Sequence, residues 1–188
     1  MKRFFLLAPL ALFIVLGGYF VAGLKRDPMR IPSVLIDRPL PAIELDAIEG
    51  FEKGFSSRDI EGEVALVNIF GSWCASCVIE HPMLMEIAAS GEVVIVGIDW
   101  KDPKGAGALW LRKNGNPYHF VGDDAAGRTA IDLGVTGAPE TFVVDANGRI
   151  RYKHVGPVTP EVWRYQLRPL VRQLKELEYD VEDDDVEG

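Results

Sequence analysis

The only two cysteines of this 188-residue chain are Cys74 and Cys77, in the stretch "SWCASC". Two thiols at this spacing can form a structural disulfide, contribute to a metal site, or exchange electrons with another pair of thiols. A disulfide across two residues closes a very short loop, so it restricts the unfolded chain too little to act mainly as a staple. Structural zinc needs four ligands, but the chain has no second cysteine pair, and its histidines are scattered at positions 81, 119 and 154. Copper(I) binding by the two thiolates stays open as an alternative to electron exchange.

The residues around the two cysteines favour electron exchange. The run "EVALVNIF" (residues 63–70) is short and almost continuously apolar, which is typical of a strand buried on both faces. Gly71 and Ser72 then turn the chain, and helical spacing follows. Cys74 is therefore expected at a helix N-terminus, where free backbone N–H groups and the helix dipole stabilise a thiolate. Cys77 lies one turn later on nearly the same face, so we predict a redox disulfide with Cys74 as the nucleophile.

Predicted strands and helices alternate along the chain. The predicted elements are, in order, a short strand (42–48), a strand (63–70), a helix (74–90), a strand (92–100), a helix (105–114), a strand end or turn (118–124), a helix (128–135), a hairpin (141–156) and a helix (159–178). The early alternation implies a parallel central pair and the hairpin adds antiparallel strands, so we predict an α/β fold with a mixed sheet. Thr159 and Pro160 fit the start of the last helix, and Pro169 predicts a kink in it. The basic residues of the hairpin are interpreted as a solvated face: Arg149, Arg151, Lys153 and His154.

The N-terminal segment is long and apolar. Residues 4–24 carry no charge, and 21 helical residues extend about 30 Å, the thickness of the hydrocarbon core of a membrane. We predict an uncleaved membrane anchor over residues 1–25, and the alternative is a signal peptide cleaved near "FVAG". The short "MKR" start favours an N-terminus on the inside and export of the remaining chain to an oxidising compartment.

Two further segments flank the predicted domain at 42–177. Residues 26–41 are rich in proline and are predicted to be a linker, and residues 178–188 are predicted to be an acidic disordered tail. From Glu176 onward the chain has eight acidic residues and no basic one, which equals the net charge of −8 of the whole chain. The remaining chain sums to zero and offers no basic patch, so nucleic-acid binding is not expected.

Two stretches that are far apart in the sequence resemble the landmarks of the thioredoxin superfamily. "VNIFGSWCASC" is similar to the strand, turn and WCxxC segment of these proteins, and Pro82 falls where the family often has a helix-kinking proline. "GVTGAPETFVVDANGRI" is similar to the family's cis-proline loop and the strand that follows it. The resemblance implies a thioredoxin fold, with Pro139 as the cis-proline beside the disulfide.

A closer resemblance, over roughly residues 35–175, is to the CcmG or DsbE family of membrane-anchored thiol:disulfide interchange proteins. The matching stretches are the anchor, "WCASC", "EHP", "NPY", "LGVTGAPETFVVD" and "GRIRYKHVGPVTPEVW". The resemblance implies a protein-disulfide reductase of cytochrome c maturation, held in the bacterial inner membrane with its catalytic domain in the periplasm. Its substrate would be apocytochrome c or the thiol partner of apocytochrome c, and its electron donor a membrane protein of the DsbD or CcdA type.

Two other functions stay open. One is a general periplasmic thiol reductase or copper-site assembly factor, and the other is a non-catalytic metallochaperone. We expect a monomer without cofactor or resident metal. The dipeptide Ala75-Ser76 lacks the proline that the family often has between its cysteines, which leaves the reduction potential open.

Several further residues are candidates for the site. Asn68 occupies the position of a buried, proton-transferring aspartate in thioredoxin, and an asparagine cannot accept a proton. Glu80 lies on the same helical stripe as Cys77, so we predict that it assists proton transfer there, although a solvated surface glutamate is the simpler alternative. The family resemblance places the carboxylate of Glu140 near the disulfide, where it would shape the partner groove. Trp73 either shields one side of the Cys74 sulfur or packs in the core.

Overall fold

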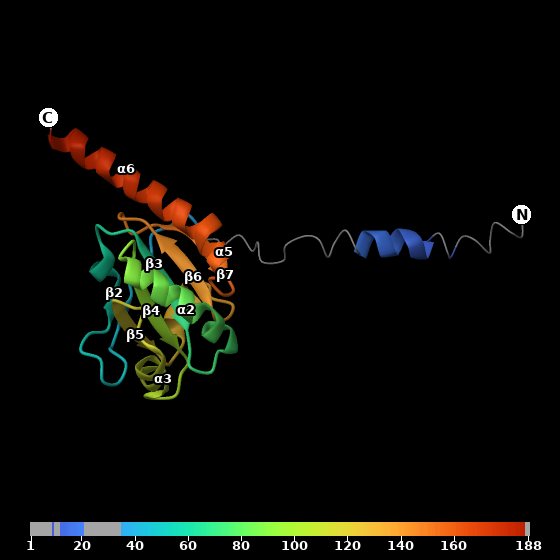
Figure 1. The fold of residues 1–188 in the computed structure, drawn as a ribbon, viewed down its shortest axis with the longest axis horizontal. Helices are drawn as coiled ribbons and strands as arrows, with labels where there is room; N and C mark the ends of the chain where they lie inside the picture. Colours follow the sequence, from blue (N-terminus) through green and yellow to red (C-terminus); the bar gives the residue numbers. More distant parts are fainter. Residues whose placement is uncertain (1–8, 10–11, 21–34, 187–188) are drawn as a thin grey trace, which may run out of the picture. The chain divides into compact units, whose positions relative to one another are not determined.

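A mixed sheet of five strands forms the centre of the folded domain in this computed structural model, which describes residues 9, 12–20 and 35–186 (Figure 1). The strand order is β5-β4-β3-β6-β7, with parallel pairing from β3 to β5 and antiparallel pairing from β3 through β6 to β7. The strands are β3 (Ala65–Phe70), β4 (Val94–Trp100), β5 (Phe120–Asp124), β6 (Glu140–Val144) and β7 (Ile150–Val155). The α/β class, the parallel central pair and the late hairpin are thus confirmed. The segment expected to be a strand end or turn is instead a full strand, β5.

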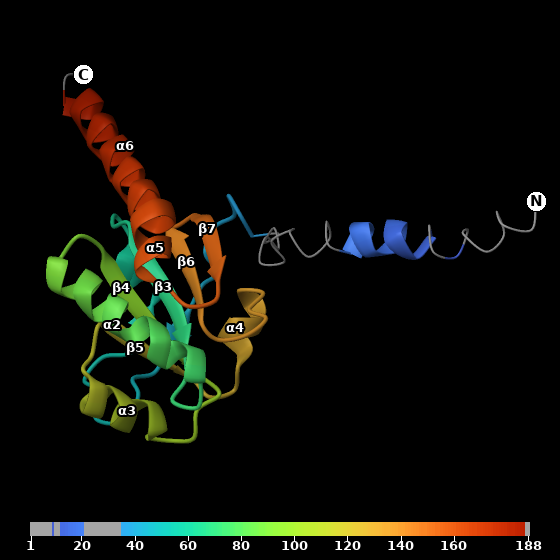
Figure 2. The same ribbon diagram turned by 45° about the vertical axis from the view of Figure 1, so that its right-hand side comes forward.

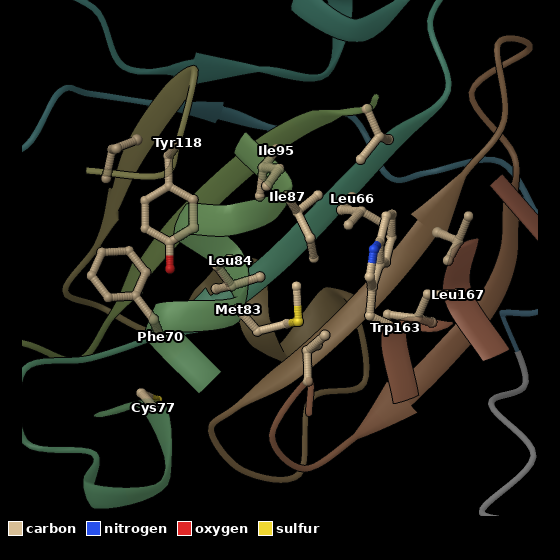
Figure 3. Close-up of a cluster of buried hydrophobic side chains, with 14 of the residues drawn as sticks. Leu66, Phe70, Cys77, Met83, Leu84, Ile87, Ile95, Tyr118, Trp163 and Leu167 are labelled. Atoms are coloured by element: carbon tan, nitrogen blue, oxygen red, sulfur yellow. The ribbon is translucent and has the colours of Figure 1, made fainter. Parts of the chain in front are cut away.

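Strand β3 lies in the middle of the sheet and is buried along its whole length. On one face, Leu66 and Phe70 pack in a cluster with Leu84 and Ile87, both from helix α2 (Ala75–Ser90) (Figure 3). On the other face, Val67 packs in a second cluster of buried residues. The continuous apolar run in the sequence therefore reflects a strand covered on both sides.

The other helices complete the two layers on either side of the sheet (Figure 2). They are the 3₁₀-helix η1 (Ser57–Ile60), α3 (Ala106–Asn114), α4 (Arg128–Asp132), α5 (Pro160–Val162), the π-helical segment η2 (Trp163–Leu167) and α6 (Arg168–Val186). Thr159 caps α5 and accepts a hydrogen bond from the Val162 N–H, as predicted. The irregularity expected from Pro169 takes the form of the π-helical segment just before it, because proline offers no N–H to the preceding turn.

The folded domain begins earlier than residue 42. A short pair of strands, β1 (Glu44–Leu45) and β2 (Phe55–Ser56), precedes the main sheet. Residues 35–41, predicted to belong to a linker, pack on the domain: the Asp37 N–H donates to the Ile150 carbonyl at 2.7 Å and the Leu40 N–H donates to the Gly148 carbonyl at 2.7 Å. The prediction that the whole of residues 26–41 is a linker is therefore not met by residues 35–41. The apolar side chains of these residues pack against the second core cluster.

The acidic C-terminal segment also differs from its prediction. Helix α6 continues to Val186 and includes much of the stretch expected to be disordered. Its first half is held by Val171 and Leu174, which are buried in the core. A helix that is already nucleated adds residues at low cost, and leucine and glutamate are good helix formers.

The predicted anchor at residues 1–25 is described only in part. Position 9 and residues 12–20 are helical. Among the residues that the structure describes, no helix combines the length and the apolar character needed to cross a membrane. The rest of the predicted span lies outside the described residues, so the anchor stays a prediction.

Candidate active site around the Cys74–Cys77 disulfide

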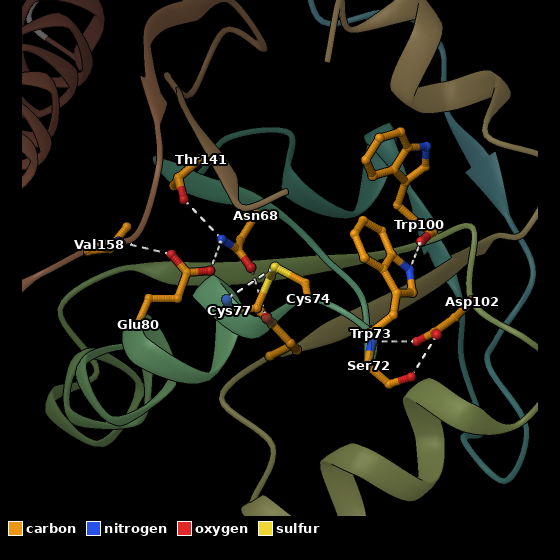
Figure 4. The surroundings of a disulfide bond; sticks show 11 residues. Asn68, Ser72, Trp73, Cys74, Cys77, Glu80, Trp100, Asp102, Thr141 and Val158 are labelled. Atoms are coloured by element: carbon orange, nitrogen blue, oxygen red, sulfur yellow. Dashed lines mark hydrogen bonds between the residues drawn. A yellow bond between two sulfur atoms is a disulfide. The ribbon is translucent and has the colours of Figure 1, made fainter. Parts of the chain in front are cut away.

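The two cysteines form a disulfide at the start of α2, directly after the turn that follows β3 (Figure 4). Their Cα atoms are 5.3 Å apart. Cys74 is the N-cap of α2, and its sulfur accepts a hydrogen bond from the Cys77 N–H at 3.1 Å. When the disulfide opens, this N–H and the helix dipole favour a thiolate at Cys74. The predicted arrangement of strand, turn and helix N-terminus is confirmed.

Trp73 lies on the surface beside the disulfide, with 52% of its area exposed. Its indole N–H donates to the Trp100 carbonyl at 3.1 Å, and the two indole rings are 5.7 Å apart. Packing in the core, one of the two interpretations of Trp73, is therefore wrong. The role of Trp73 in shielding the Cys74 sulfur stays a prediction.

Glu80 is buried, with only 1% of its area exposed, one turn beyond Cys77 on α2. The Asn68 amide donates to one carboxylate oxygen at 3.0 Å, and the Val158 N–H donates to the other at 2.9 Å. Burial raises the pKa of Glu80 to about 7, although both hydrogen bonds favour the charged form. The alternative of a solvated surface glutamate is wrong, and the site holds a carboxyl group that titrates near neutral pH.

Asn68 organises this buried network rather than taking a proton itself. The Tyr118 hydroxyl donates to the Asn68 carbonyl oxygen at 2.8 Å, which turns the amide N–H₂ group toward Glu80 and Thr141. Asn68 on β3 thus holds the carboxyl group of Glu80, which α2 supplies, in place. Tyr118 stands in the sequence only as part of "NPY", and its contact with Asn68 could not be predicted because the two residues are 50 positions apart.

The raised pKa of Glu80 predicts a specific dependence of stability on pH. In the unfolded chain the pKa of this carboxyl group has its ordinary value of 4.5. The stability linked to the protonated form is therefore complete below pH 4.5 and is lost as the pH rises through about 7. From about pH 5 to about pH 8, we expect the free energy of unfolding of the wild type to fall by roughly 2.5 kcal/mol relative to that of Glu80→Gln, which does not titrate. Denaturant unfolding of both oxidised proteins at several pH values measures this, and parallel curves would contradict it.

Pro139 and Glu140 form the loop that the family resemblance places beside the disulfide. The Ala138–Pro139 peptide bond is cis, as expected. The carboxylate of Glu140 is fully buried; one oxygen accepts hydrogen bonds from the N–H and hydroxyl of Thr136, and the other lies 2.8 Å from the Lys153 ammonium. The partners of this carboxylate are therefore Thr136 and Lys153, which fix it directly after the cis-proline, and the role of Glu140 in shaping a partner groove stays a prediction.

Lys153 corrects another expectation. It was assigned to a solvated face of the hairpin, but only 6% of its side chain is exposed, and its ammonium also donates to the Gly134 carbonyl at 2.7 Å. The alternation of basic residues along β7 did not reveal that one of them has a buried partner on the neighbouring strand.

A further contact, not predicted from the sequence, lies just before Cys74. Both the N–H and the hydroxyl of Ser72 donate to the carboxylate of Asp102 at 2.7 Å (Figure 4). The available signal was topological, since loops that follow neighbouring parallel strands leave the sheet at the same edge. Within the described part of the chain, no group of three or more histidine, cysteine, aspartate or glutamate side chains is arranged to hold a metal ion.

Comparisons with known proteins agree with this chemistry. Residues 36–167 match the Redoxin family. The chain is 45% identical over 174 residues to the thiol:disulfide interchange protein DsbE of Pseudomonas aeruginosa, covering 93% of this chain and 96% of that protein. It is 37% identical over 177 residues to DsbE of Escherichia coli K12, covering 90% and 95% of the two chains.

The fold is also found among solved structures. A DsbF homologue from Corynebacterium diphtheriae aligns with a TM-score of 0.63 at 24% identity, over 79% of this chain and 97% of the other. A thiol-disulfide isomerase from Corynebacterium glutamicum aligns with a TM-score of 0.55 at 24% identity, over 72% and 96%. At this identity the likeness shows the thioredoxin-like fold alone. Taken with the curated relatives and the cysteine pair at the start of α2, it leads to the conclusion that this chain belongs to the CcmG/DsbE family of thiol:disulfide oxidoreductases.

Proposed function

We propose that this oxidoreductase supplies electrons for c-type cytochrome assembly, by reducing the disulfide of the Cys-x-x-Cys-His motif of apocytochrome c or of its thiol partner. The observation that carries the proposal is the buried Glu80 carboxyl group on α2 one turn beyond Cys77, whose pKa is about 7. A dithiol reductant must lose a proton from its second cysteine during each turnover, and a carboxyl group with this pKa can accept it near neutral pH.

The reaction proceeds in two exchanges. The Cys74 thiolate attacks one sulfur of the substrate disulfide, which forms a mixed disulfide and releases the other substrate sulfur as a thiolate. Glu80 takes the proton of Cys77, and the Cys77 thiolate then attacks Cys74. The substrate leaves with two reduced sulfurs, and the enzyme leaves with the Cys74–Cys77 disulfide.

The same proposal includes a location and an electron donor. The uncharged segment 4–24 anchors the chain in the bacterial inner membrane, and the catalytic domain lies in the periplasm. Because this compartment is oxidising, the disulfide must be reduced again by a membrane protein of the DsbD or CcdA type. The protein acts as a monomer without a cofactor.

Covalent trapping tests the substrate directly. In the full-length Cys77→Ser variant, the second exchange cannot occur, so the mixed disulfide between Cys74 and the substrate should accumulate in cells. We expect apocytochrome c or its thiol partner among the trapped proteins, and no adducts in the Cys74→Ser control. Adducts with unrelated cysteine proteins alone would instead support a general reductase.

Deletion of the gene separates the remaining alternatives. We expect c-type cytochromes to be lost and then restored by an added small thiol, since the thiol replaces the missing reductant. Normal cytochrome levels would contradict the proposal. Stoichiometric, tightly held metal in the reduced full-length protein would favour the metallochaperone.

A further inference from the structure

The loop before Cys74 and the loop after β4 leave the sheet side by side. Strands β3 and β4 are parallel neighbours, with Phe70 paired to Asp99 at their ends. The first loop carries Ser72 and Trp73, and the second carries Asp102. The position of the nucleophile therefore depends on how these two loops are joined.

Asp102 joins them through both of its carboxylate oxygens. One oxygen accepts the Ser72 N–H and the other accepts the Ser72 hydroxyl, each at 2.7 Å. Asp102 is 8% exposed, so water competes little for these bonds. Hydrogen bonds to a carboxylate are stronger than neutral ones, and a two-point contact also fixes orientation.

Trp73 adds a third connection, from the first loop to the last residue of β4. Its indole N–H donates to the Trp100 carbonyl at 3.1 Å. The Cys74 N–H donates to the Gly71 carbonyl at 3.0 Å and closes the turn. Ser72 is thus held by the loop after β4 and Trp73 by the end of β4, and the turn that they form ends at Cys74.

Asp99, near the end of β4, is a buried carboxyl group that lines the same cavity as Asp102. It is 4% exposed, and α3 packs so closely against it that a Cβ atom on Gly107 would lie 1.9 Å from one carboxyl oxygen. Burial, together with a hydrogen bond to Asp102 and the charges of Asp102 and Asp123, raises the pKa of Asp99 to about 8. Near neutral pH Asp99 therefore keeps its proton, so it does not place a second negative charge beside Asp102.

We propose that Asp102 is a positioning residue for Cys74, which holds the Gly71–Cys74 turn through both donors of Ser72. The contact matters most in the reduced enzyme, where the bond between Cys74 and Cys77 no longer fixes the sulfur. The contact between Asp102 and Ser72 then keeps Cys74 at the N-terminus of α2, in the geometry for attack on the substrate disulfide. A displaced nucleophile lowers the rate of the chemical step more than it lowers substrate binding.

Single-turnover reduction of a peptide with one disulfide, by the reduced full-length protein, tests this. We expect Ser72→Ala and Asp102→Asn each to lower the maximal rate about tenfold, with the half-saturating peptide concentration unchanged within about twofold. Ser72→Thr keeps the hydroxyl donor and should retain the wild-type rate. The double variant Ser72→Ala/Asp102→Asn should be no slower than the slower single variant, because Ser72→Ala removes one of the two hydrogen bonds that Asp102→Asn disrupts.

Asp132→Asn is the control, because it makes the same chemical change at an exposed carboxylate on α4. We expect it to retain the wild-type rate. The proposal is overturned if Asp102→Asn and Ser72→Ala react like the wild type, if Asp132→Asn is slowed equally, or if the two effects multiply in the double variant. If Asp102→Asn does not fold, the pair Ser72→Ala and Ser72→Thr decides alone.

Discussion

Replacing Glu80 with glutamine is expected to slow the release of reduced substrate about 100-fold, the lower end of what a positioned acid or base contributes. Glutamine has the same size but cannot accept the proton of Cys77. The first attack by Cys74 does not need Glu80, so the mixed disulfide should form at the wild-type rate and then persist. Rapid acid quenching followed by mass spectrometry measures the formation and the decay of this intermediate separately.

The pH dependence gives the same prediction a second readout. In the wild type, the decay rate should rise with pH as Glu80 loses its proton near pH 7, the value to which burial raises its pKa. The rise at this pH should be absent in Glu80→Gln. Glu86→Gln is the control, because Glu86 is an exposed carboxylate on the same helix. Equal decay rates for the wild type and Glu80→Gln would remove Glu80 from the mechanism.

Replacing Lys153 with methionine is expected to lower the free energy of unfolding by about 3 kcal/mol, since it leaves a buried carboxylate without its cation. The Lys153–Glu140 pair is 6% and 0% exposed, and methionine retains the contact with the Phe142 ring over which the lysine lies. The loop that carries Pro139 should loosen as well, so the half-saturating concentration of a disulfide peptide should rise. Denaturant unfolding and the peptide assay measure the two effects.

Two variants make this result specific. The double variant Lys153→Met/Glu140→Gln removes both charges and should be more stable than Lys153→Met alone. Arg151→Met lies on the same strand, but Arg151 is 36% exposed where it pairs with Asp37 and Asp145. Replacing Arg151 should lower the free energy of unfolding by less than about 1 kcal/mol. Equal costs at positions 151 and 153 would mean that burial of the Lys153–Glu140 pair has no special weight.

Local patterns in the sequence were enough to predict the sheet and the place of the nucleophile. The apolar run of β3, the Asn147-Gly148 turn and the helical spacing after Cys74 each report on residues that are neighbours in the chain. Glu80 is an example of a residue whose environment local patterns do not predict. Helical periodicity places it on the stripe of Cys77, but the Val158 N–H that donates to its carboxylate is 78 residues away.

The acidic residues behind the turn could not be assigned for the same reason. Asp102 looks like a loop aspartate in "WKDP", and its partner Ser72 lies 30 residues earlier. Lys153 alternates with other basic residues along β7, and only the pairing of β6 with β7 brings it to Glu140. Contacts across strands and between loops follow from topology, which single-sequence patterns define only coarsely.

The stretch from residue 37 to residue 47, which includes β1, has a consequence for how the sheet meets other proteins. Pro39 forms a bridge with Arg149 beside β7, and Ala47 forms a bridge with Gly122 in β5, so one stretch of chain covers part of both outer strands of the sheet. Uncovered outer strands offer free backbone groups that recruit strands from other molecules and promote aggregation. A soluble form shortened to start at residue 42 would uncover β7, and one that keeps residues 35–41 retains the cover.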